Sequence, residues 1–251
     1  MSEGVTPQGL VKIINHYLSA MSSPIRANKG ILDKYIGDAI MAYWGPPFVV
    51  EDEQANLACL AAIDMIDGVG TLRKELPEIL GVRAIPMEID IRVGIATGEV
   101  LAGSIGSELM MSFTVMGDAV NLASRLEAAN KEYGTRSLLS EATVAALQTS
   151  FELREIDRLI VLGQTQPQAV FEIMGREGSL TPQQLTLRDR YAEGLAAYRE
   201  QRWGEARKAF AAALQAIDDD GPTLTFLKRI DAFESKPPPA DWDGAWQMES
   251  K

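Results

Sequence analysis

Acidic, basic and amide side chains gather in two short stretches of this 251-residue chain, and their types suit the binding of a nucleoside triphosphate. The first stretch, ILDKYIGDAIMAYWG, spans residues 31–45. The second runs from RVGIATGEVLAG at 92–103 to FTVMGDAVNLASR at 113–125. Guanidinium and ammonium groups pair with phosphate oxygens, and carboxylates ligate divalent cations. These two stretches are therefore where we expect the chemistry of the protein.

The first stretch predicts a tight turn. Apolar runs flank Gly37 and Asp38, and a glycine followed by an aspartate between two such runs is typical of a two-residue hairpin with a primed turn. We therefore expect Asp38 at an exposed tip. As an alternative, Asp38 is only a turn-forming residue, because aspartate is common in turns.

The second stretch predicts a strand followed by a helix. The strand covers 112–116, and the helix begins near Ala119 with Asp118 as its N-cap. Asn121 and Arg125 are four residues apart and therefore share one face of this helix, where they could meet a phosphorylated ligand. The expected buried stripe consists of Ala119, Leu122, Leu126 and Ala129. As an alternative, the amide and the guanidinium form only an exposed polar face, although asparagine is a poor helix-interior residue.

Both stretches resemble the catalytic domain of the class III adenylate and guanylate cyclases, and more closely its bacterial homodimeric branch. The resemblance covers Met1 to Met174, because residue types and their order match over long runs. It implies an adenylate cyclase, a phosphorus–oxygen lyase that converts ATP to 3′,5′-cyclic AMP and pyrophosphate in intracellular signalling.

The resemblance also implies a role for five side chains. Asp38 resembles the family's second metal-binding aspartate. Lys34 and Thr114 resemble the pair that reads the purine base. Asn121 resembles the amide that positions the ribose, and Arg125 resembles the arginine that stabilises the transition state.

The combination of Lys34 with Thr114 favours ATP. In the family, lysine with aspartate or threonine accompanies ATP, whereas guanylate cyclases carry glutamate and cysteine at these positions. A lysine donor and a threonine hydroxyl suit the ring-nitrogen acceptor and the 6-amino donor of adenine. The alternatives are that Lys34 is a solvated strand lysine paired with Asp33 or Asp38, and that Thr114 is an ordinary β-branched strand residue.

The resemblance further implies two Mg²⁺ or Mn²⁺ ions and a second subunit. The ions would activate the 3′-hydroxyl for attack on the α-phosphorus and neutralise the triphosphate, while Arg125 would stabilise charge on the α-phosphate. In the family, one subunit provides the metal-binding aspartates and the other provides the purine pair, the asparagine and the arginine. We therefore expect a homodimer with two equivalent sites.

Two departures from the family pattern bear on activity. The family begins with a strand carrying a Phe-x-Asp-Ile/Met-x-Gly-Phe motif and the first metal-binding aspartate, whereas this sequence starts, at residues 1–4, after that motif. At 161–164 it reads VLGQ, so the neutral Gln164 stands where family members commonly use a lysine. Because a single aspartate binds Mg²⁺ poorly, we predict an N-terminally truncated cyclase with weak or no activity.

The alternatives are an inactive cyclase-like module that dimerises and regulates through its helical tail, and an adaptor whose working part is that tail.

Composition limits the function classes. The 24 basic and 35 acidic residues give a net charge of −11, which argues against a nucleic-acid or anionic-membrane surface. Without a signal peptide or an apolar run of about 20 residues, we expect a cytoplasmic protein, or the cytoplasmic part of one with an upstream sensor or membrane domain. The single cysteine, Cys59, is expected to be a buried structural thiol, and the single histidine, His16, a structural or surface residue.

Periodicity predicts an α+β fold. We expect helices from Pro7 to about Ile25 and from Asp52 to Leu76, and a strand pair that joins 89–97 to 99–102 around Gly98. Further strands are expected at 112–116, 137–139, 151–156 and 169–174, with helices from about 119 and after 140. Antiparallel hairpins interleaved with helices indicate α+β, and the resemblance implies a ferredoxin-like sheet that lacks its first strand.

The sequence changes character after residue 175. We expect the cyclase domain to span 1–175 and a small all-α tail to span 176–251. The small and aromatic positions of one tetratricopeptide unit are matched by Gly194, Ala206, Phe210 and Ala213. Since such repeats need about three copies for independent stability, this helical hairpin is expected to dock on the cyclase domain or on a partner, with Trp242 and Trp246 as anchors.

Overall fold

The computed structural model describes residues 6–82, 89–160, 166–239 and 241–247, which form two compact units. The first unit comprises Met1–Ile91, Gly98–Val120 and Ala146–Gln148, and the second comprises Arg92–Thr97, Asn121–Ala145 and Thr149–Lys251. The departures noted at 1–4 and at Gln164 lie outside the described residues.

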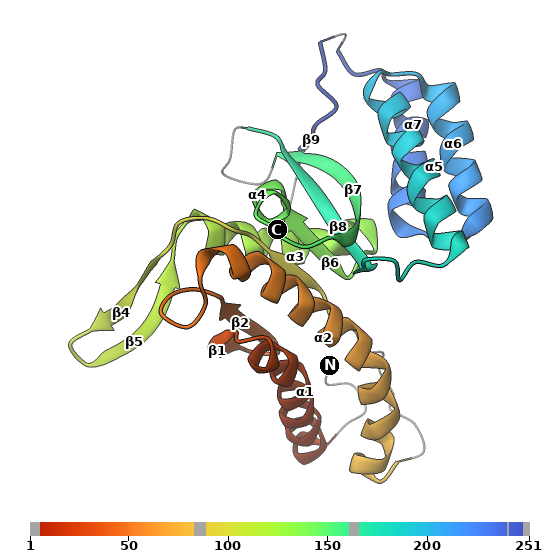
Figure 1. Ribbon diagram of the computed structural model, residues 1–251. Helices are drawn as coiled ribbons and strands as arrows, with labels where there is room; N and C mark the ends of the chain where they lie inside the picture. Colours follow the sequence, from red (N-terminus) through yellow and green to blue (C-terminus); the bar gives the residue numbers. More distant parts are fainter. Residues whose placement is uncertain (1–5, 83–88, 161–165, 240, 248–251) are drawn as a thin grey trace. The chain divides into compact units, whose positions relative to one another are not determined.

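The first unit combines two helices with two antiparallel hairpins (Figure 1). Its elements are α1 (Pro7–Ala27), β1 (Ile31–Ile36), β2 (Ala39–Tyr43), α2 (Glu51–Leu80), β4 (Leu101–Ser107) and β5 (Met110–Met116). Thr6 caps α1, because its hydroxyl accepts a hydrogen bond from the Gly9 amide at 3.1 Å. Apolar faces of α1 and α2 pack together, and the buried side chains include Ile13, Met21, Leu72 and Leu76.

Helix α2 corrects the expectation that the sequence has no apolar run long enough to cross a membrane. An 18-residue window within it reaches a mean hydropathy of 1.3, so by length and composition α2 could cross a membrane. Half of that window is nevertheless buried inside the protein. A core helix passes the same test, because its buried face is filled with residues such as Ala61, Ile63 and Leu72.

The second unit contains a five-stranded mixed sheet with helices. Its elements are β3 (Val93–Ile95), most of α3 (Asp118–Tyr133), β6 (Ser137–Ser140), α4 (Glu141–Ala145), β7 (Phe151–Ile160), β8 (Gln168–Arg176), α5 (Pro182–Arg199), α6 (Trp203–Ala216), α7 (Gly221–Ser235) and β9 (Trp246–Gln247). The strand order is β3-β6-β8-β7-β9, with parallel pairing between β3 and β6 and between β7 and β9. Helices and mixed strands confirm the α+β class, whereas the ferredoxin-like description stays a prediction.

The predicted strand pair around Gly98 is wrong. β3 pairs with β6, and the segment after Gly98 forms β4, which pairs with β5 from Leu101↔Met116 to Ser107↔Met110. Glycines and serines fill β4, and these residues have low strand propensity, so this strand resembles a loop in the sequence. Its ladder with the apolar β5 determines its conformation.

The C-terminal tail forms three helices, α5 to α7, that belong to the second unit. Gly194 of α5 faces the Phe210 ring of α6 so closely that a Cβ would lie 2.6 Å from it, which explains the glycine. Tyr191 of α5, Phe210 of α6 and Phe226 of α7 pack together in one aromatic cluster. Kinship with tetratricopeptide units and the boundary near residue 175 both stay predictions.

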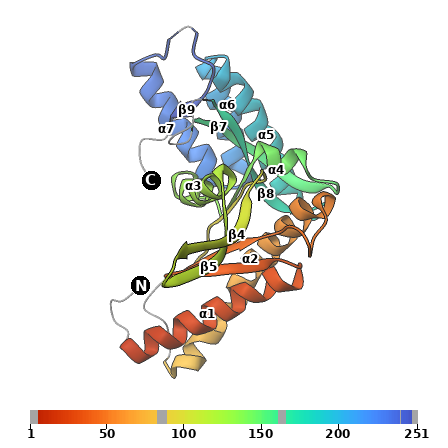
Figure 2. The same ribbon diagram turned by 90° about the vertical axis from the view of Figure 1, so that its left-hand side faces the viewer.

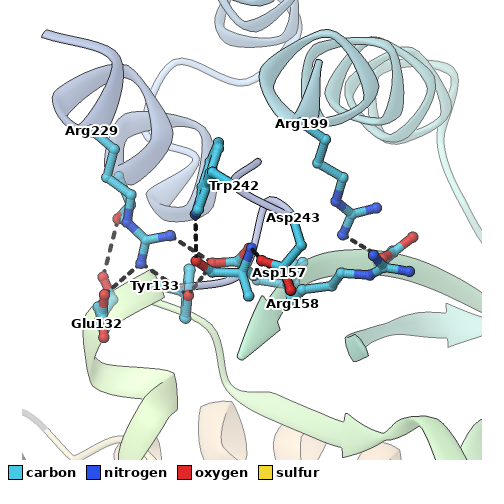
Figure 3. A network of polar contacts seen from close by, with 12 residues as sticks. Glu132, Tyr133, Asp157, Arg158, Arg199, Arg229, Trp242 and Asp243 are labelled. Atoms are coloured by element: carbon cyan, nitrogen blue, oxygen red, sulfur yellow. Dashed lines mark hydrogen bonds and ion pairs between the residues drawn. The ribbon is translucent and has the colours of Figure 1, made fainter. Parts of the chain in front are cut away.

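Buried ion pairs attach this tail to the rest of its unit (Figure 3). The Arg229 guanidinium donates to Asp157 of β7 at 2.6 Å and to Glu132 of α3 at 2.5 Å. Tyr133 also donates to Asp157, at 2.6 Å, and burial raises the pKa of that carboxyl although Arg229 opposes the shift. The tail therefore docks on α3 and β7, as expected for a helical hairpin too small to stand alone.

Both predicted tryptophan anchors pack within the second unit. Trp242 lies against Tyr198 and Phe233 at ring distances of 5.3 and 5.2 Å. Trp246 belongs to β9 and stacks under the Arg229 guanidinium at 3.8 Å.

Candidate active site

The β1–β2 hairpin has the predicted two-residue turn. Ile36 pairs with Ala39, and Gly37 adopts a φ of +66°, as the first turn residue of a type II′ hairpin requires. Asp38 is exposed at the tip. The turn thus places a single carboxylate in solvent, as expected from the sequence.

A β-bulge in β1 directs two neighbouring side chains toward β5. The ladder shifts between Leu32, which pairs with Ala42, and Lys34, which pairs with Met41, so Asp33 is the extra residue of the bulge. β5 lies beside β1 in the first unit (Figure 2). The Lys34 ammonium donates a 3.0 Å hydrogen bond to the Thr114 hydroxyl of β5. The two residues predicted to read the purine are therefore in contact.

Asp33 is buried beneath this pair. Its side chain is 0% exposed, whereas the Lys34 side chain is 40% exposed. Asp33 Oδ2 accepts hydrogen bonds from the Thr114 hydroxyl at 2.6 Å and from the Val115 amide at 3.2 Å. Its Oδ1 lies 3.3 Å from Lys34 Nζ. Burial and the negative charge of Asp33 raise the pKa of Tyr43 on the neighbouring β2.

Sequence reasoning considered Asp33 only as a possible partner of Lys34. That ion pair exists, but Asp33 also accepts from Thr114, so it is part of the site. Aspartate is depleted in strands, so a carboxylate inside the apolar run of β1 is the signal that could have identified it.

Asn121 and Arg125 lie on α3, in the second unit. Leu122, Leu126 and Ala129 form the buried stripe as predicted, but Ala119 at its start is only half-buried. Asn121 is exposed and Arg125 half-exposed. Gly94 of β3 lies directly against α3, since a Cβ there would stand 2.0 Å from the Ala123 carbonyl oxygen. The helix begins at Asp118, one residue earlier than expected.

The metal-binding residues are incomplete in the described part of the chain. Asp38 is the predicted ligand, and no group of three His, Cys, Asp or Glu side chains suited to a metal ion occurs among the described residues. One exposed carboxylate does not hold a divalent ion by itself. These residues therefore do not fit a two-ion site on their own.

The remaining singled-out residues have structural roles. His16 Nε2 lies 3.0 Å from Glu75 Oε2 at the surface. Cys59 is fully buried, and burial raises the pKa of its thiol to about 12. Both predictions are confirmed.

Comparison with known proteins identifies the family. Residues 1–175 match the profile of the adenylate and guanylate cyclase catalytic domain. An adenylate cyclase of Anabaena cylindrica is 36% identical over 176 residues, which cover 69% of this chain and 34% of that protein. The terminal-differentiation-specific adenylate cyclase of Dictyostelium discoideum is 32% identical over 232 residues, or 91% of this chain and 10% of that protein. The chain thus spans about a third of the first relative and a tenth of the second.

Solved structures agree. The adenylyl cyclase CyaB of P. aeruginosa superposes with a TM-score of 0.64 at 28% identity, covering 72% of this chain and 89% of that one. The guanylyl cyclase Cya2 superposes with a TM-score of 0.56 at 27% identity, covering 72% and 87%. Since the profile covers more than half of the sequence and the folds agree, this chain belongs to the adenylate and guanylate cyclase catalytic domain family.

Proposed function

We propose that this chain is an adenylate cyclase domain that converts ATP to 3′,5′-cyclic AMP and pyrophosphate. The single observation that carries the proposal is the hydrogen bond between Lys34 and Thr114. Guanylyl cyclases share the fold, so the choice of base depends on these side chains and not on the architecture.

The pair matches the hydrogen-bonding edge of adenine. The Lys34 ammonium has donors only and suits the ring nitrogen N1, while the Thr114 oxygen can accept from the 6-amino group. Guanine presents an N–H and a carbonyl oxygen at the same places, so it offers a donor to the ammonium and an acceptor to the threonine oxygen. ATP is therefore the proposed substrate.

The reaction is an intramolecular displacement at the α-phosphorus. The bond between the ribose 3′-oxygen and the α-phosphorus forms, the bond to the β-phosphate oxygen breaks, and the hydroxyl proton passes to water. In the proposal Asn121 holds the ribose so that the hydroxyl is in line, and Arg125 stabilises the charge that grows on the α-phosphate.

Divalent cations belong to the proposal as the partners of the triphosphate. Mg²⁺ or Mn²⁺ would neutralise phosphate charge and activate the 3′-hydroxyl in a two-metal reaction. Asp38 would provide one ligand. Because the described residues do not complete such a site, no step above depends on a metal held by them.

We further propose that the active form is a homodimer. Supporting this, the β4–β5 hairpin exposes an apolar surface in the first unit, and apolar patches of this kind mark interaction sites. Its members Leu101, Leu109, Met110 and Phe113 are between 61% and 97% exposed. A second copy of the chain is the proposed occupant of this apolar surface. The proposed location of the protein is the cytoplasm.

A direct assay tests the proposal. Purified protein is incubated with ATP or GTP and with Mg²⁺ or Mn²⁺, and cyclic AMP, cyclic GMP and pyrophosphate are measured by chromatography. We expect cyclic AMP in excess over cyclic GMP, and loss of product in Arg125→Ala. The same cyclic GMP yield as cyclic AMP would contradict the base assignment.

The lack of a complete set of metal ligands among the described residues favours a second candidate, a cyclase-like module that binds nucleotide and dimerises without turnover. Its working part would be the helical tail, which buried ion pairs attach to α3. Binding of a non-cyclisable ATP analogue, together with no cyclic AMP formed from ATP at any metal concentration, would select this candidate.

A further inference from the structure

The extra residue of the β1 bulge contacts both members of the purine pair. A bulge re-aims side chains, and here it brings the carboxylate of Asp33 and the ammonium of Lys34 to the same hydroxyl of Thr114. A buried carboxylate is expensive to maintain unless it is paired, and stability alone does not require one between two apolar strands. Its three contacts all involve Thr114, Val115 or Lys34.

Asp33 determines which way the Thr114 hydroxyl points. A hydroxyl has one proton and two lone pairs, so an isolated threonine can serve a ligand as donor or as acceptor. A carboxylate only accepts, and the Thr114 hydroxyl donates its proton to Asp33 Oδ2 at 2.6 Å. The oxygen of Thr114 is left as an acceptor, and it accepts from Lys34 Nζ in this structure.

We propose that Asp33 is a positioning residue that sets the base selectivity of this site, by committing Thr114 to accept and by holding Lys34 as the donor. A purine with an exocyclic amino group then finds an acceptor, whereas a 6-carbonyl purine meets oxygen against oxygen. The inference rests on the proposed function and deepens it, because it names a third residue of the base pocket. Asp33 does not need to touch the nucleotide.

Asp33→Asn tests this role with little change in volume. The neutral amide lacks the charge that holds the Thr114 proton and the Lys34 ammonium in place, so the hydroxyl is freer to donate to a 6-carbonyl group. We expect the ratio of affinities for non-cyclisable ATP and GTP analogues, measured by calorimetry, to fall about tenfold. Glu53→Gln, which removes an exposed carboxylate of the same unit, is the matched control and should leave the ratio unchanged.

A rescue separates this role from a structural one. Thr114→Asp in the Asp33→Asn background places an acceptor-only group at position 114 directly, so it should restore the preference for the ATP analogue. An unchanged ratio in Asp33→Asn, or a lost preference that the double variant does not restore, would overturn the proposal.

Folding and turnover are checked separately. Thermal melting monitors each variant, and if Asp33→Asn does not fold, Asp33→Ser replaces it with the same expected loss. If neither variant folds, Asp33 is a stability residue and the proposal is wrong. If wild-type protein binds the ATP analogue preferentially but forms no cyclic AMP, the proposed enzyme function fails while the selectivity result still decides the role of Asp33.

Discussion

The ammonium of Lys34 and the hydroxyl of Thr114, 80 residues apart in sequence, meet at 3.0 Å between Nζ and Oγ1. The contact joins a hairpin strand to a strand of a different hairpin within the first unit. It turns two unremarkable strand residues into a donor–acceptor pair with a defined spacing.

Exchanging the members of this pair should change the preferred base. In Lys34→Glu with Thr114→Cys, the group facing the purine ring nitrogen becomes an acceptor that suits the N–H of guanine. We expect the ATP-to-GTP ratio of kcat/KM to fall at least about tenfold even if total turnover drops. Competing-substrate assays measure this ratio, and a ratio equal to that of wild type would remove both residues from the base pocket.

Complementation between inactive variants tests the shared site. If Asp38 and Arg125 reach one nucleotide from different subunits, Asp38→Ala and Arg125→Ala should each lose about 100-fold or more of the activity. In coexpressed protein half of the dimers are mixed, and one site in each is intact, so about a quarter of wild-type activity should return.

Two controls accompany that experiment. Native mass spectrometry confirms that mixed dimers form, and coexpression of two differently tagged Asp38→Ala chains should remain inactive. Mixed dimers as inactive as their parents would show that Asp38 and Arg125 act within one chain.

The ion pair of Arg229 with Asp157 should contribute strongly to stability. Removing the guanidinium leaves a buried carboxylate unpaired, so Arg229→Ala should lower the free energy of unfolding by about 3–5 kcal/mol. Urea unfolding monitored by circular dichroism measures the change. Arg207→Ala is the matched control, because Arg207 pairs with Asp231 and Glu234 at the exposed surface and its loss should have little effect. Equal effects of the two substitutions would contradict the interpretation of Arg229 as a buried anchor.

The buried thiol of Cys59 predicts a pH dependence of stability. Burial raises the pKa of Cys59 from 9.0 to about 12, so above pH 9 the unfolded chain releases this proton before the folded protein does. The free energy of unfolding is therefore expected to fall by about 1.4 kcal/mol per pH unit from this group between its two pKa values, with no contribution below pH 9.

Cys59→Ala isolates this contribution. The substitution adds a constant loss from the small cavity, but the stability of the variant should fall less steeply than that of wild type between pH 9 and 10.5. Buried tyrosines titrate in both proteins and cancel in the difference. Parallel pH profiles would mean that Cys59 is accessible enough to ionise in the folded state.

Local patterns in the sequence were sufficient for many elements of the fold. The Gly37–Asp38 turn, the Thr6 cap of α1 and the buried stripe of α3 at Leu122 and Leu126 all follow from interactions within a few residues. Such interactions are the same in any context, so spacing and residue type determine them. The residue order of the two motif stretches likewise indicated the cyclase family.

Pairings between distant segments were decided only by the tertiary structure. The glycine-rich β4 is a strand because the apolar β5 pairs with it, and β3 finds its partner in β6 more than 40 residues later. The bulge at Asp33 is also invisible in the sequence, since an extra residue in a ladder exists only relative to its partner strand. Side chains such as Asp33 and Thr114 acquire their chemistry from the groups that burial brings within hydrogen-bonding distance, and no local pattern encodes that distance.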